Sequence, residues 1–409
     1  MYWANFFHIY QPPNWSPRII KKVANESYRP IIDILKRHPK VKITLNISAS
    51  LTEQLHELGL KDIIQNFSKL AKKKQIEFTG TAIYHPILPL MPTMEIIRQI
   101  KLNTKTNQKY LGKVYNPQGF FSPEMAYGRK VATAIESLGY KWILADEICY
   151  NGKLDSAKLN AAYQIKGIKL NIIFRNRYIS DYFSFHSNPN NLQYFWEEVK
   201  QENRFKPALI TGMDGENLGH HRKGWDIFWE NLVTDKKVTT LTLSELLKKY
   251  KTKKIISPRR GSWSSQTREI SNGAPYILWD DPQNKIHQYQ WHLIRHLAEL
   301  VEKNKQHTNY KIARGLLDKR VASDQFWWAS AKPWWSLSII KKKTKELVEI
   351  SDKISTNEKL TKKLSHQIIQ EATSWQTENK FKNIADRYLQ TNEDKNGGVR
   401  FIGGKKITS

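Results

Sequence analysis

The sequence predicts the α/β fold class, with a TIM-like barrel followed by a helical region. Short apolar runs alternate with amphipathic helical patterns through the first two thirds of the chain, and seven or eight such runs occur. After about Trp279 the apolar runs stop and only helical patterns continue. These observations predict a barrel over residues 1–282, a helical region over residues 283–390 and a flexible tail over residues 391–409.

Each strand is predicted where apolar residues cluster between polar or turn-forming segments. In chain order these are residues 3–7, 42–47, 76–81, 119–122, 142–145, 170–174 and 208–212, with a further strand at 238–241. Apolar residues three and four apart predict the intervening helices, among them 27–36, 51–58, 63–73, 94–111 and 130–138. Later helices are predicted at 285–303, 308–318, 336–351 and 356–388.

The composition bounds the class of protein. Hydrophobic residues make up 40% and charged residues 25% of the 409 residues, which excludes wholesale disorder. The formal net charge is +28, but the lysines are scattered over nearly every predicted helix. We interpret this charge as a solvated surface and do not expect a nucleic acid partner. The 14 tryptophans offer flat faces on which sugar rings could stack, although most single tryptophans fill cores.

Cysteine usage and hydropathy indicate the compartment. The one cysteine, Cys149, excludes an internal disulfide and fits a reducing environment. The first residues lack the pattern of a signal peptide, and no stretch approaches the length of a membrane span. We therefore expect a cytoplasmic protein with no membrane partner, and the sequence leaves the oligomeric state open.

Polar side chains follow several predicted strands at the point where each strand ends. They are His8 and Gln11 after the first strand, His85 after the third, Glu124 after the fourth, and Asp214 and Glu216 after the seventh. A single histidine at a barrel mouth is more often structural than catalytic. Because the carboxyl ends of barrel strands meet at one mouth, we expect both histidines to converge with Glu124 and Asp214.

Two carboxylates that face each other are what cleavage of a glycosidic bond requires. One carboxyl group protonates the departing oxygen, and the other attacks or stabilises the sugar cation. Glu124 and Asp214 are the predicted pair. Neighbouring histidines can hydrogen-bond to sugar hydroxyls or to a carboxylate, so that one acid stays ionised while the other keeps its proton.

Five segments that carry these residues occur in a fixed order. They are His8-Ile-Tyr-Gln-Pro, Gly80-Thr-Ala-Ile-Tyr-His85-Pro-Ile-Leu-Pro, Gly119-Phe-Phe-Ser-Pro-Glu124-Met-Ala-Tyr, Thr211-Gly-Met-Asp214-Gly-Glu-Asn-Leu-Gly-His220 and Ala322-Ser-Asp324-Gln-Phe-Trp327-Trp. In order and spacing they resemble the five motifs of glycoside hydrolase family 57. The resemblance covers roughly residues 1–330 and rests on five motifs together.

The resemblance implies an incomplete seven-unit barrel and a helical region that contributes to the active-site cleft. It also implies action on α-glucans or maltooligosaccharides with retention of configuration, without a cofactor or a catalytic metal. By position, Glu124 is the implied nucleophile and Asp214 the implied acid/base. The implied substrate-binding residues are His8, Gln11, His85, Glu216, His220, Trp263, Asp324 and Trp327.

Several alternatives stay open at the level of single residues. Arg175 and Trp263 lie in stretches that resemble the family more weakly, and either is a subsite residue or has a structural role. Asp146 and Glu147 end the fifth predicted strand and either support the site or form a solvated strand end. The sequence does not separate α-amylase, 4-α-glucanotransferase and branching activity, because that choice depends on how water is excluded.

Three other readings compete at the level of function. A metal-dependent carbohydrate enzyme would use His8, His85 and Asp214 as ligands, but Tyr10 stands where such sites usually have a second ligand. A nucleic-acid-binding protein is favoured only by charge and interleaved aromatic residues. A glucan-binding protein without catalysis would use the same cleft.

Overall fold

The computed structural model of the chain describes residues 1–157, 161–202, 208–250, 253–355, 358–391, 400–402 and 405–407. Two units are found, one made of Met1–Ile83 and Leu88–Thr267 and the other of Tyr84–Ile87 and Arg268–Ser409. The predicted boundaries at residues 282 and 390 stay predictions. Of the predicted flexible tail, residues 392–399, 403–404 and 408–409 lie outside the described residues.

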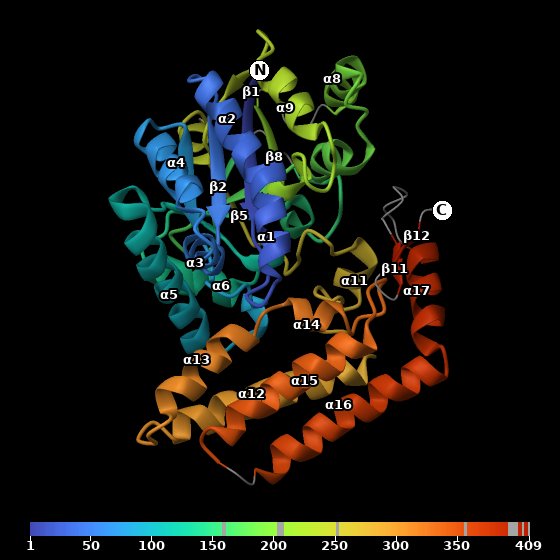
Figure 1. The fold of residues 1–409 in the computed structure, drawn as a ribbon. Helices are drawn as coiled ribbons and strands as arrows, with labels where there is room; N and C mark the ends of the chain where they lie inside the picture. The colour runs from blue at the N-terminus through green and yellow to red at the C-terminus, as the bar shows by residue number, and fades with distance from the viewer. Residues whose placement is uncertain are drawn as a thin grey trace. The chain divides into compact units, whose positions relative to one another are not determined.

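The first unit is built on a sheet of mostly parallel strands that curls into a half-barrel (Figure 1). Its strands are β1 Tyr2–Ile9, β2 Ile43–Ile47, β3 Ile76–Gly80, β4 Gly119–Phe121, β5 Trp142–Asp146, β6 Ala162–Ile165, β7 Asn171–Arg175, β8 Ala208–Asp214, β9 Thr239–Thr240 and β10 Lys253–Ile256. Hydrogen-bonded neighbours follow the order β10-β6-β7-β5-β4-β3-β2-β1-β8, and β9 pairs with β1. The predicted fold class, an incomplete TIM-like barrel followed by a helical region, is confirmed.

All eight predicted strands are present, and two further described strands of this sheet, β6 and β10, were not predicted. β6 runs antiparallel to β7 and is joined to it by a short turn, so it breaks the alternation of strand and helix on which the prediction depended. β10 pairs with β6 at the edge of the sheet and carries Lys253 and Lys254. Charged residues are typical of edge strands, and they hide the strand from a search for apolar runs.

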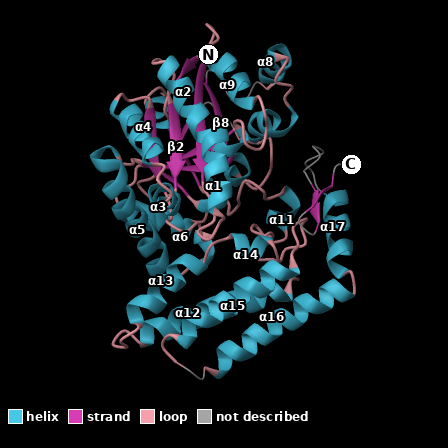
Figure 2. Ribbon diagram, viewed as in Figure 1, coloured by secondary structure: helices cyan, strands magenta, loops and turns pink. Residues whose placement is uncertain are grey.

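The helices of the first unit lie around the sheet, and most of them present an apolar stripe to the strands. They are α1 Pro17–Val23, α2 Arg29–Arg37, α3 Ala49–Glu57, α4 Lys61–Lys72, α5 Thr93–Leu111, α6 Arg129–Ser137, α7 Arg177–Asp181, α8 Leu192–Gln201, α9 Trp225–Val233 and α10 Leu243–Leu247. Figure 2 shows α2 and α4 outside the strands, and in α2 the stripe consists of buried isoleucine and leucine side chains. The five helices predicted between the strands are confirmed to within a few residues.

Alternation along the strands decides which side chains enter the half-barrel. Side chains two apart on a strand share a face. Ala4 and Phe6 of β1, Trp142 and Leu144 of β5, and Ala208 and Ile210 of β8 belong to one buried cluster. The next residues on this inner face, toward the carboxyl ends of the strands, are His8, Asp146 and, beyond Gly212, Asp214. The inner face therefore changes from apolar to ionisable where the strands end.

The second unit is helical. Its elements are α11 Thr267–Ser271, which begins at the last residue of the first unit, then α12 Lys285–Lys303, α13 Tyr310–Arg320, α14 Asp324–Trp327, α15 Leu337–Asp352, α16 Lys359–Thr377 and α17 Lys380–Thr391, followed by the antiparallel strands β11 Arg400–Ile402 and β12 Lys405–Ile407. The long helices α12, α15 and α16 lie side by side (Figure 1). Aromatic pairs close its core, including Trp291 stacked on Phe326 with centroids 4.3 Å apart.

One helix predicted from the sequence is wrong, because the structure has two helices in its place. Residues 356–388 were expected to form a single helix, but α16 ends at Thr377 and α17 begins at Lys380. Asn379 has φ of 53°, a left-handed conformation that interrupts a helix and that asparagine tolerates. Residues 356–357 lie outside the described residues.

Close packing at β4 allows a prediction about stability. A Cβ atom added to Gly119 would lie 2.0 Å from the Trp142 ring, so we expect Gly119→Ala to destabilise the protein. Overpacking of this kind costs about 2–3 kcal/mol. Urea unfolding would measure it, with Gly315→Ala in α13 as control, because nothing lies within 4 Å of a Cβ there. Equal stability of the two variants would contradict the prediction.

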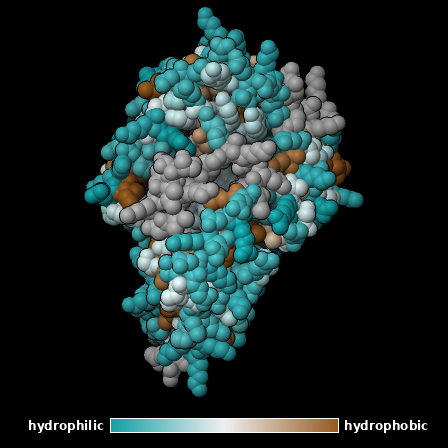
Figure 3. Space-filling view, turned by 90° about the vertical axis from the view of Figure 1, so that its right-hand side faces the viewer, coloured by the Kyte–Doolittle hydropathy of each residue, from teal (hydrophilic) through white to brown (hydrophobic). Residues whose placement is uncertain are grey.

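The surface is predominantly hydrophilic. Figure 3 shows one face on which hydrophobic residues are scattered among hydrophilic ones. Exposed apolar side chains such as Met94, Ile227 and Ile255 come from different elements, as is normal for single surface residues. Within the described parts of the chain, no helix has both the length and the hydropathy needed to cross a membrane.

Candidate active site

Glu124 lies in a strained turn directly after β4. The turn is the short 3-10 helix Pro123–Met125, and Glu124 has φ of 58° and ψ of 20°, in the left-handed region. A non-glycine residue in this region costs free energy and is held there by its surroundings, which is common at functional sites. The Glu124 side chain is 5% exposed, and the Nε1–H of Trp263 donates a hydrogen bond of 2.9 Å to its Oε2.

Trp263 connects Glu124 to the first strand. Its ring centroid lies 6.1 Å from that of His8 and 5.8 Å from that of Phe121, and the His8 and Phe121 rings are 4.7 Å apart. The backbone N–H of Trp263 also donates to the carbonyl of Glu124 at 3.4 Å. Glu124 and His8 therefore lie against one aromatic wall formed by Phe121 and Trp263.

Asp214 is the last residue of β8, and the register of β1 with β8 places it opposite His8. Desolvation raises the pKa of Asp214 to about 6, while the positive charge of Arg175 acts to lower it. A carboxyl group with this pKa can hold a proton in mildly acidic solution and release it near neutrality. That property suits an acid/base group.

His8 is neutral at pH 7. Desolvation lowers the pKa of His8 to about 4, although its hydrogen bond to Asn46 acts to raise it. The Nδ1 atom of His8 donates to Oδ1 of Asn46 at 2.7 Å, and Nδ2 of Asn46 donates to Thr79 at 2.8 Å. Because Nδ1 carries the proton in this arrangement, Nε2 of the neutral ring is a hydrogen-bond acceptor.

Glu216 is held by three donors from the amino-terminal segments. The hydroxyl of Tyr28, the backbone N–H of Tyr10 and Nε2 of Gln11 all donate to its Oε1, at 2.6, 3.2 and 3.3 Å. Desolvation, followed by the charge of Asp214, raises the pKa of Glu216 to about 8. At neutral pH Glu216 is therefore mainly protonated, and Asp214 does not face a second full negative charge.

A buried ionic network supports the same end of the half-barrel. Asp146 is fully buried at the end of β5, where Nε of Arg175 donates to it at 2.7 Å and an η nitrogen of Arg177 at 2.6 Å. Burial alone would raise the pKa of Asp146, but Arg177 and Arg175 hold it below its usual value. Glu147 is also buried and accepts from the backbone N–H of Arg177 at 2.8 Å. The alternative of a solvated strand end for Asp146 and Glu147 is wrong.

The second unit brings together two distant predicted segments. His85 is buried with φ of 57°, and its Nδ1 lies 3.0 Å from the Ser323 hydroxyl. The backbone N–H of Ser323 donates to the carbonyl of His85, so Asp324, the first residue of α14, follows directly after this contact. Trp327 stacks between Trp279 and Trp334, with centroid distances of 6.3 and 5.4 Å.

His220 makes a contact of its own in the first unit. Its Nδ1 lies 2.6 Å from Oε2 of Glu26, on the π-helical turn Ala24–Tyr28. Gly219 allows this approach, because a Cβ there would lie 2.0 Å from the Glu26 carbonyl oxygen and φ is +100°. Within the first unit, therefore, His8, Glu124, Asp214 and Trp263 are brought together by contacts, with Gln11 and Glu216 beside Asp214, whereas His220 bonds to Glu26.

The competing reading of a metal-dependent enzyme would need a cluster of ligands. Among the residues that the structure describes, no group of three or more histidine, cysteine, aspartate and glutamate side chains is arranged to hold a metal ion.

Sequence reasoning missed Asn46, Tyr28 and Arg177. Asn46 is a polar residue at the end of an apolar strand, the same signal that identified His8, and it could have been found. Tyr28 fits the apolar stripe of a helical pattern, and nothing local marks its contact with Glu216. Arg177 looks like a surface residue in a basic sequence, and only the tertiary structure buries it beside Asp146.

A parallel half-barrel whose strand ends carry buried carboxyl groups beside aromatic rings is an architecture that suits the cleavage of glycosidic bonds. The model of glycosyl hydrolase family 57 matches residues 4–259, more than half of the chain, and the chain belongs to this family. The resemblance found in the five motifs is thereby confirmed, as is the prediction of an enzyme.

Curated relatives and a solved structure agree with this assignment. The chain is 25% identical over 264 residues to an alpha-amylase of Pyrococcus horikoshii, covering 61% of this chain and 40% of the relative. It is 24% identical over 258 residues to a 4-alpha-glucanotransferase of Thermococcus litoralis, covering 59% and 38%. The chain thus spans about two fifths of the length of these curated relatives. A branching enzyme of this family from Pyrococcus horikoshii has the same fold, with a TM-score of 0.69 at 14% identity over 97% of this chain and 98% of that one.

Proposed function

We propose that the chain is a retaining enzyme that acts on α-1,4-linked glucans through Glu124 as nucleophile and Asp214 as acid/base. Glu124 attacks the anomeric carbon, and Asp214 protonates the departing glycosidic oxygen. Asp214 then removes a proton from water or from a second glucan hydroxyl, which releases the sugar from Glu124. Water gives hydrolysis and a sugar hydroxyl gives transfer.

The observation that carries this proposal is the contrast between the surroundings of the two carboxyl groups. Trp263 donates to Oε2 of Glu124, and a donor of this kind stabilises the ionised carboxylate that a nucleophile requires. Desolvation instead raises the pKa of Asp214 to about 6, which favours the protonated form that an acid requires. Two carboxyl groups whose environments favour opposite protonation states can take these two roles.

The other predicted residues take supporting roles in this proposal. Nε2 of neutral His8 accepts a hydrogen bond from a sugar hydroxyl near the scissile bond. Gln11 and Glu216 keep the surroundings of Asp214 in place, and the face of Trp263 contacts a sugar ring. His85, His220, Asp324 and Trp327 are further proposed substrate contacts. No cofactor or metal takes part in the proposed steps.

The names of the relatives support the substrate class. An alpha-amylase and a 4-alpha-glucanotransferase both act on α-glucans. The family model matches residues 4–259, a range that includes both proposed catalytic residues. A cytoplasmic location and the absence of a nucleic acid partner belong to the same proposal. They are supported by the single cysteine, Cys149, which is buried, and by the scattered basic residues.

The experiment is to incubate the protein with maltoheptaose and amylose and to follow both chain lengths and reducing ends. Longer and shorter products without new reducing ends would identify transfer, and new reducing ends would identify hydrolysis. New branch points would identify branching, and they are detected as side chains that a debranching enzyme releases. β-Linked cellooligosaccharides are the matched control and should be unchanged. Unchanged maltoheptaose and amylose would contradict the proposal.

A further inference from the structure

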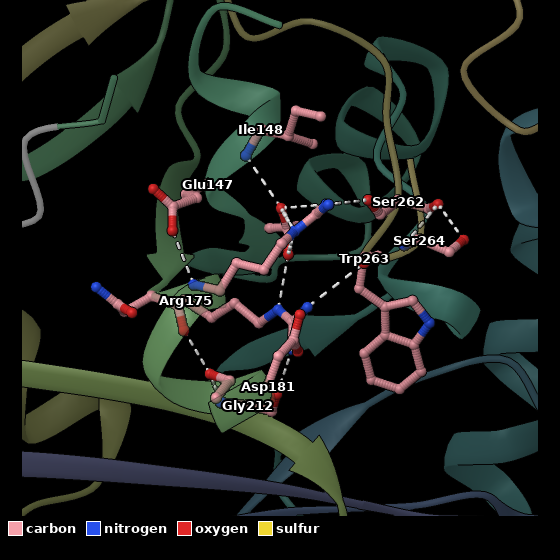
Figure 4. A network of polar contacts seen from close by, with 12 residues as sticks. Glu147, Ile148, Arg175, Asp181, Gly212, Ser262, Trp263 and Ser264 are labelled. Carbon is pink, nitrogen blue, oxygen red and sulfur yellow. Dashed lines mark hydrogen bonds and ion pairs between the residues drawn. The ribbon is translucent and has the colours of Figure 1, made fainter. Parts of the chain in front are cut away.

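The side chain of Arg175 touches both halves of the site. It extends from the last residue of β7, is 3% exposed and lies on the inner face of the half-barrel. One of its η nitrogens donates to the carbonyl of Gly212, two residues before Asp214 on β8, at 2.8 Å. The other donates to the carbonyl of Trp263 at 3.4 Å, and the guanidinium carbon lies 5.8 Å from the Trp263 ring centroid. Figure 4 shows Arg175 between Gly212, Asp181 and Trp263.

Trp263, which Arg175 contacts, is in turn hydrogen-bonded to Glu124. Its indole N–H donates to the Glu124 carboxylate, and its backbone N–H donates to the Glu124 carbonyl. A shift of the loop that carries Trp263 would therefore move the donor away from Glu124. Arg175 restrains this loop from one side, and the pairing of Tyr127 with Gly261 restrains it from another.

The guanidinium group is fixed by its own partners. Asp146 accepts from Nε of Arg175 at 2.7 Å, and Asp181 accepts from one η nitrogen at 3.2 Å. Arg177 shares Asp146 but donates to the backbone carbonyls of Ser262 and Ser265. A planar group with five donors can serve these partners at once, whereas a lysine ammonium cannot.

We propose that Arg175 is a positioning residue that links the two halves of the site, holding the Trp263 donor on Glu124 and the end of β8 that carries Asp214. This inference rests on the proposed function for its meaning in catalysis, but not for its main measurement. Arg175 thereby links the geometry around the nucleophile to the strand that carries the acid/base group.

The charged and titratable groups around Asp214 come from four elements. They are Arg175 from β7, Glu216 from the turn after β8, Tyr28 from the turn before α2 and His8 from β1. His8 and Tyr28 are neutral across the mildly acidic range, because the pKa of His8 is lowered to about 4 and that of Tyr28 is raised well above its usual value. Glu216 is protonated there as well, since its pKa is raised to about 8. Arg175 is therefore the positively charged group that acts on Asp214 when Asp214 titrates, and the proposed nucleophile Glu124 is the anionic group of the same site.

The test compares Arg175→Met, which removes both the charge and the guanidinium donors, with Arg175→Lys, which keeps the charge but not the planar guanidinium. NMR of isotope-labelled aspartate carboxyl carbons follows Asp214, whose signal is identified by its loss in Asp214→Asn. We expect the Asp214 titration to move to higher pH in Arg175→Met and to stay near the wild-type position in Arg175→Lys. Arg177→Met is the matched control, because it also takes one guanidinium from Asp146, and we expect it to leave the Asp214 titration in place.

The second readout separates positioning from charge. We expect Arg175→Lys to lower kcat about tenfold to a hundredfold with little change in KM, because the donor on Glu124 is displaced while the glucan contacts stay. An unmoved Asp214 titration in Arg175→Met, or a wild-type kcat in Arg175→Lys, would overturn the inference. If Arg175→Met does not fold, the Arg175→Lys result decides. Failure of the proposed function would appear differently, as wild-type protein that leaves α-glucans unchanged while the NMR titrations still follow the expected order.

Discussion

Glu124→Gln is expected to lower kcat on maltooligosaccharides by about 10³-fold or more, because an amide cannot form the glycosyl-enzyme bond. Glutamine has nearly the shape of glutamate and keeps an oxygen that accepts from the Trp263 N–H. The fold and the strained turn should therefore survive, and the loss would report chemistry. The measurement is single-turnover cleavage of maltoheptaose, with thermal unfolding as the check on folding.

Asp214→Asn should behave differently according to the leaving group. On maltoheptaose we expect a loss of about 10²–10⁴-fold, because general acid assistance is removed. An aryl maltooligoside carries a phenol that can leave without being protonated. With this substrate we expect Asp214→Asn to form the glycosyl-enzyme again, whereas Glu124→Gln should not. Glu57→Gln, on the exposed end of α3, is the matched control and should be fully active. Equal activity of wild type and either site variant would reject the assignment.

Asp146→Ala is expected to have the largest effect on stability. Asp146 is fully buried, and two guanidinium groups with side chains only 4% and 3% exposed share its carboxylate. Removing one partner of a buried ion pair costs about 3–5 kcal/mol, since the remaining charges stay desolvated. Urea unfolding at pH 7 would measure the loss. We also expect reduced activity, because both arginines lose the group that orients them.

The control for this prediction is an exposed ion pair. Asp33 and Lys36 lie on α2 with side chains 56% and 46% exposed and a separation of 3.6 Å. Pairs of this kind contribute about 0–1 kcal/mol, so Asp33→Ala should be close to wild type. If Asp146→Ala and Asp33→Ala unfold at the same urea concentration, the network around Asp146 does not stabilise the fold.

Most of the fold could be predicted because the strands of a half-barrel are buried on both faces. Runs such as residues 43–47 and 142–146 are buried throughout and mostly apolar, and they stand out from the amphipathic helices beside them. β6 and β10 were missed because they lie at the edge of the sheet, outside the βα repeat. The break between α16 and α17 depends on one left-handed residue, Asn379, and helical periodicity alone does not reveal it.

Part of the candidate site could be predicted for the same physical reason. His8 and Asp214 lie at the ends of buried strands and Glu124 follows one, and an ionisable side chain there is costly unless it is used. The roles of Arg175, Arg177 and Tyr28 could not be read in this way, because their contacts join segments far apart in the chain. Arg177 and Ser262, for example, are 85 positions apart. A basic surface residue and a buried guanidinium look alike in a sequence with 66 lysines and arginines.

The most direct test of the carboxylate pair is azide rescue with an α-maltosyl fluoride, a substrate that needs no acid. In Glu124→Ala, azide would replace the nucleophile and invert the anomeric centre once, giving a β-glycosyl azide. In Asp214→Ala, azide would attack the glycosyl-enzyme formed on Glu124, giving an α-glycosyl azide after two inversions. NMR of the anomeric proton distinguishes the two products. The account predicts a β-azide from Glu124→Ala and an α-azide from Asp214→Ala, and the reverse pattern, or the same azide from both variants, would contradict it.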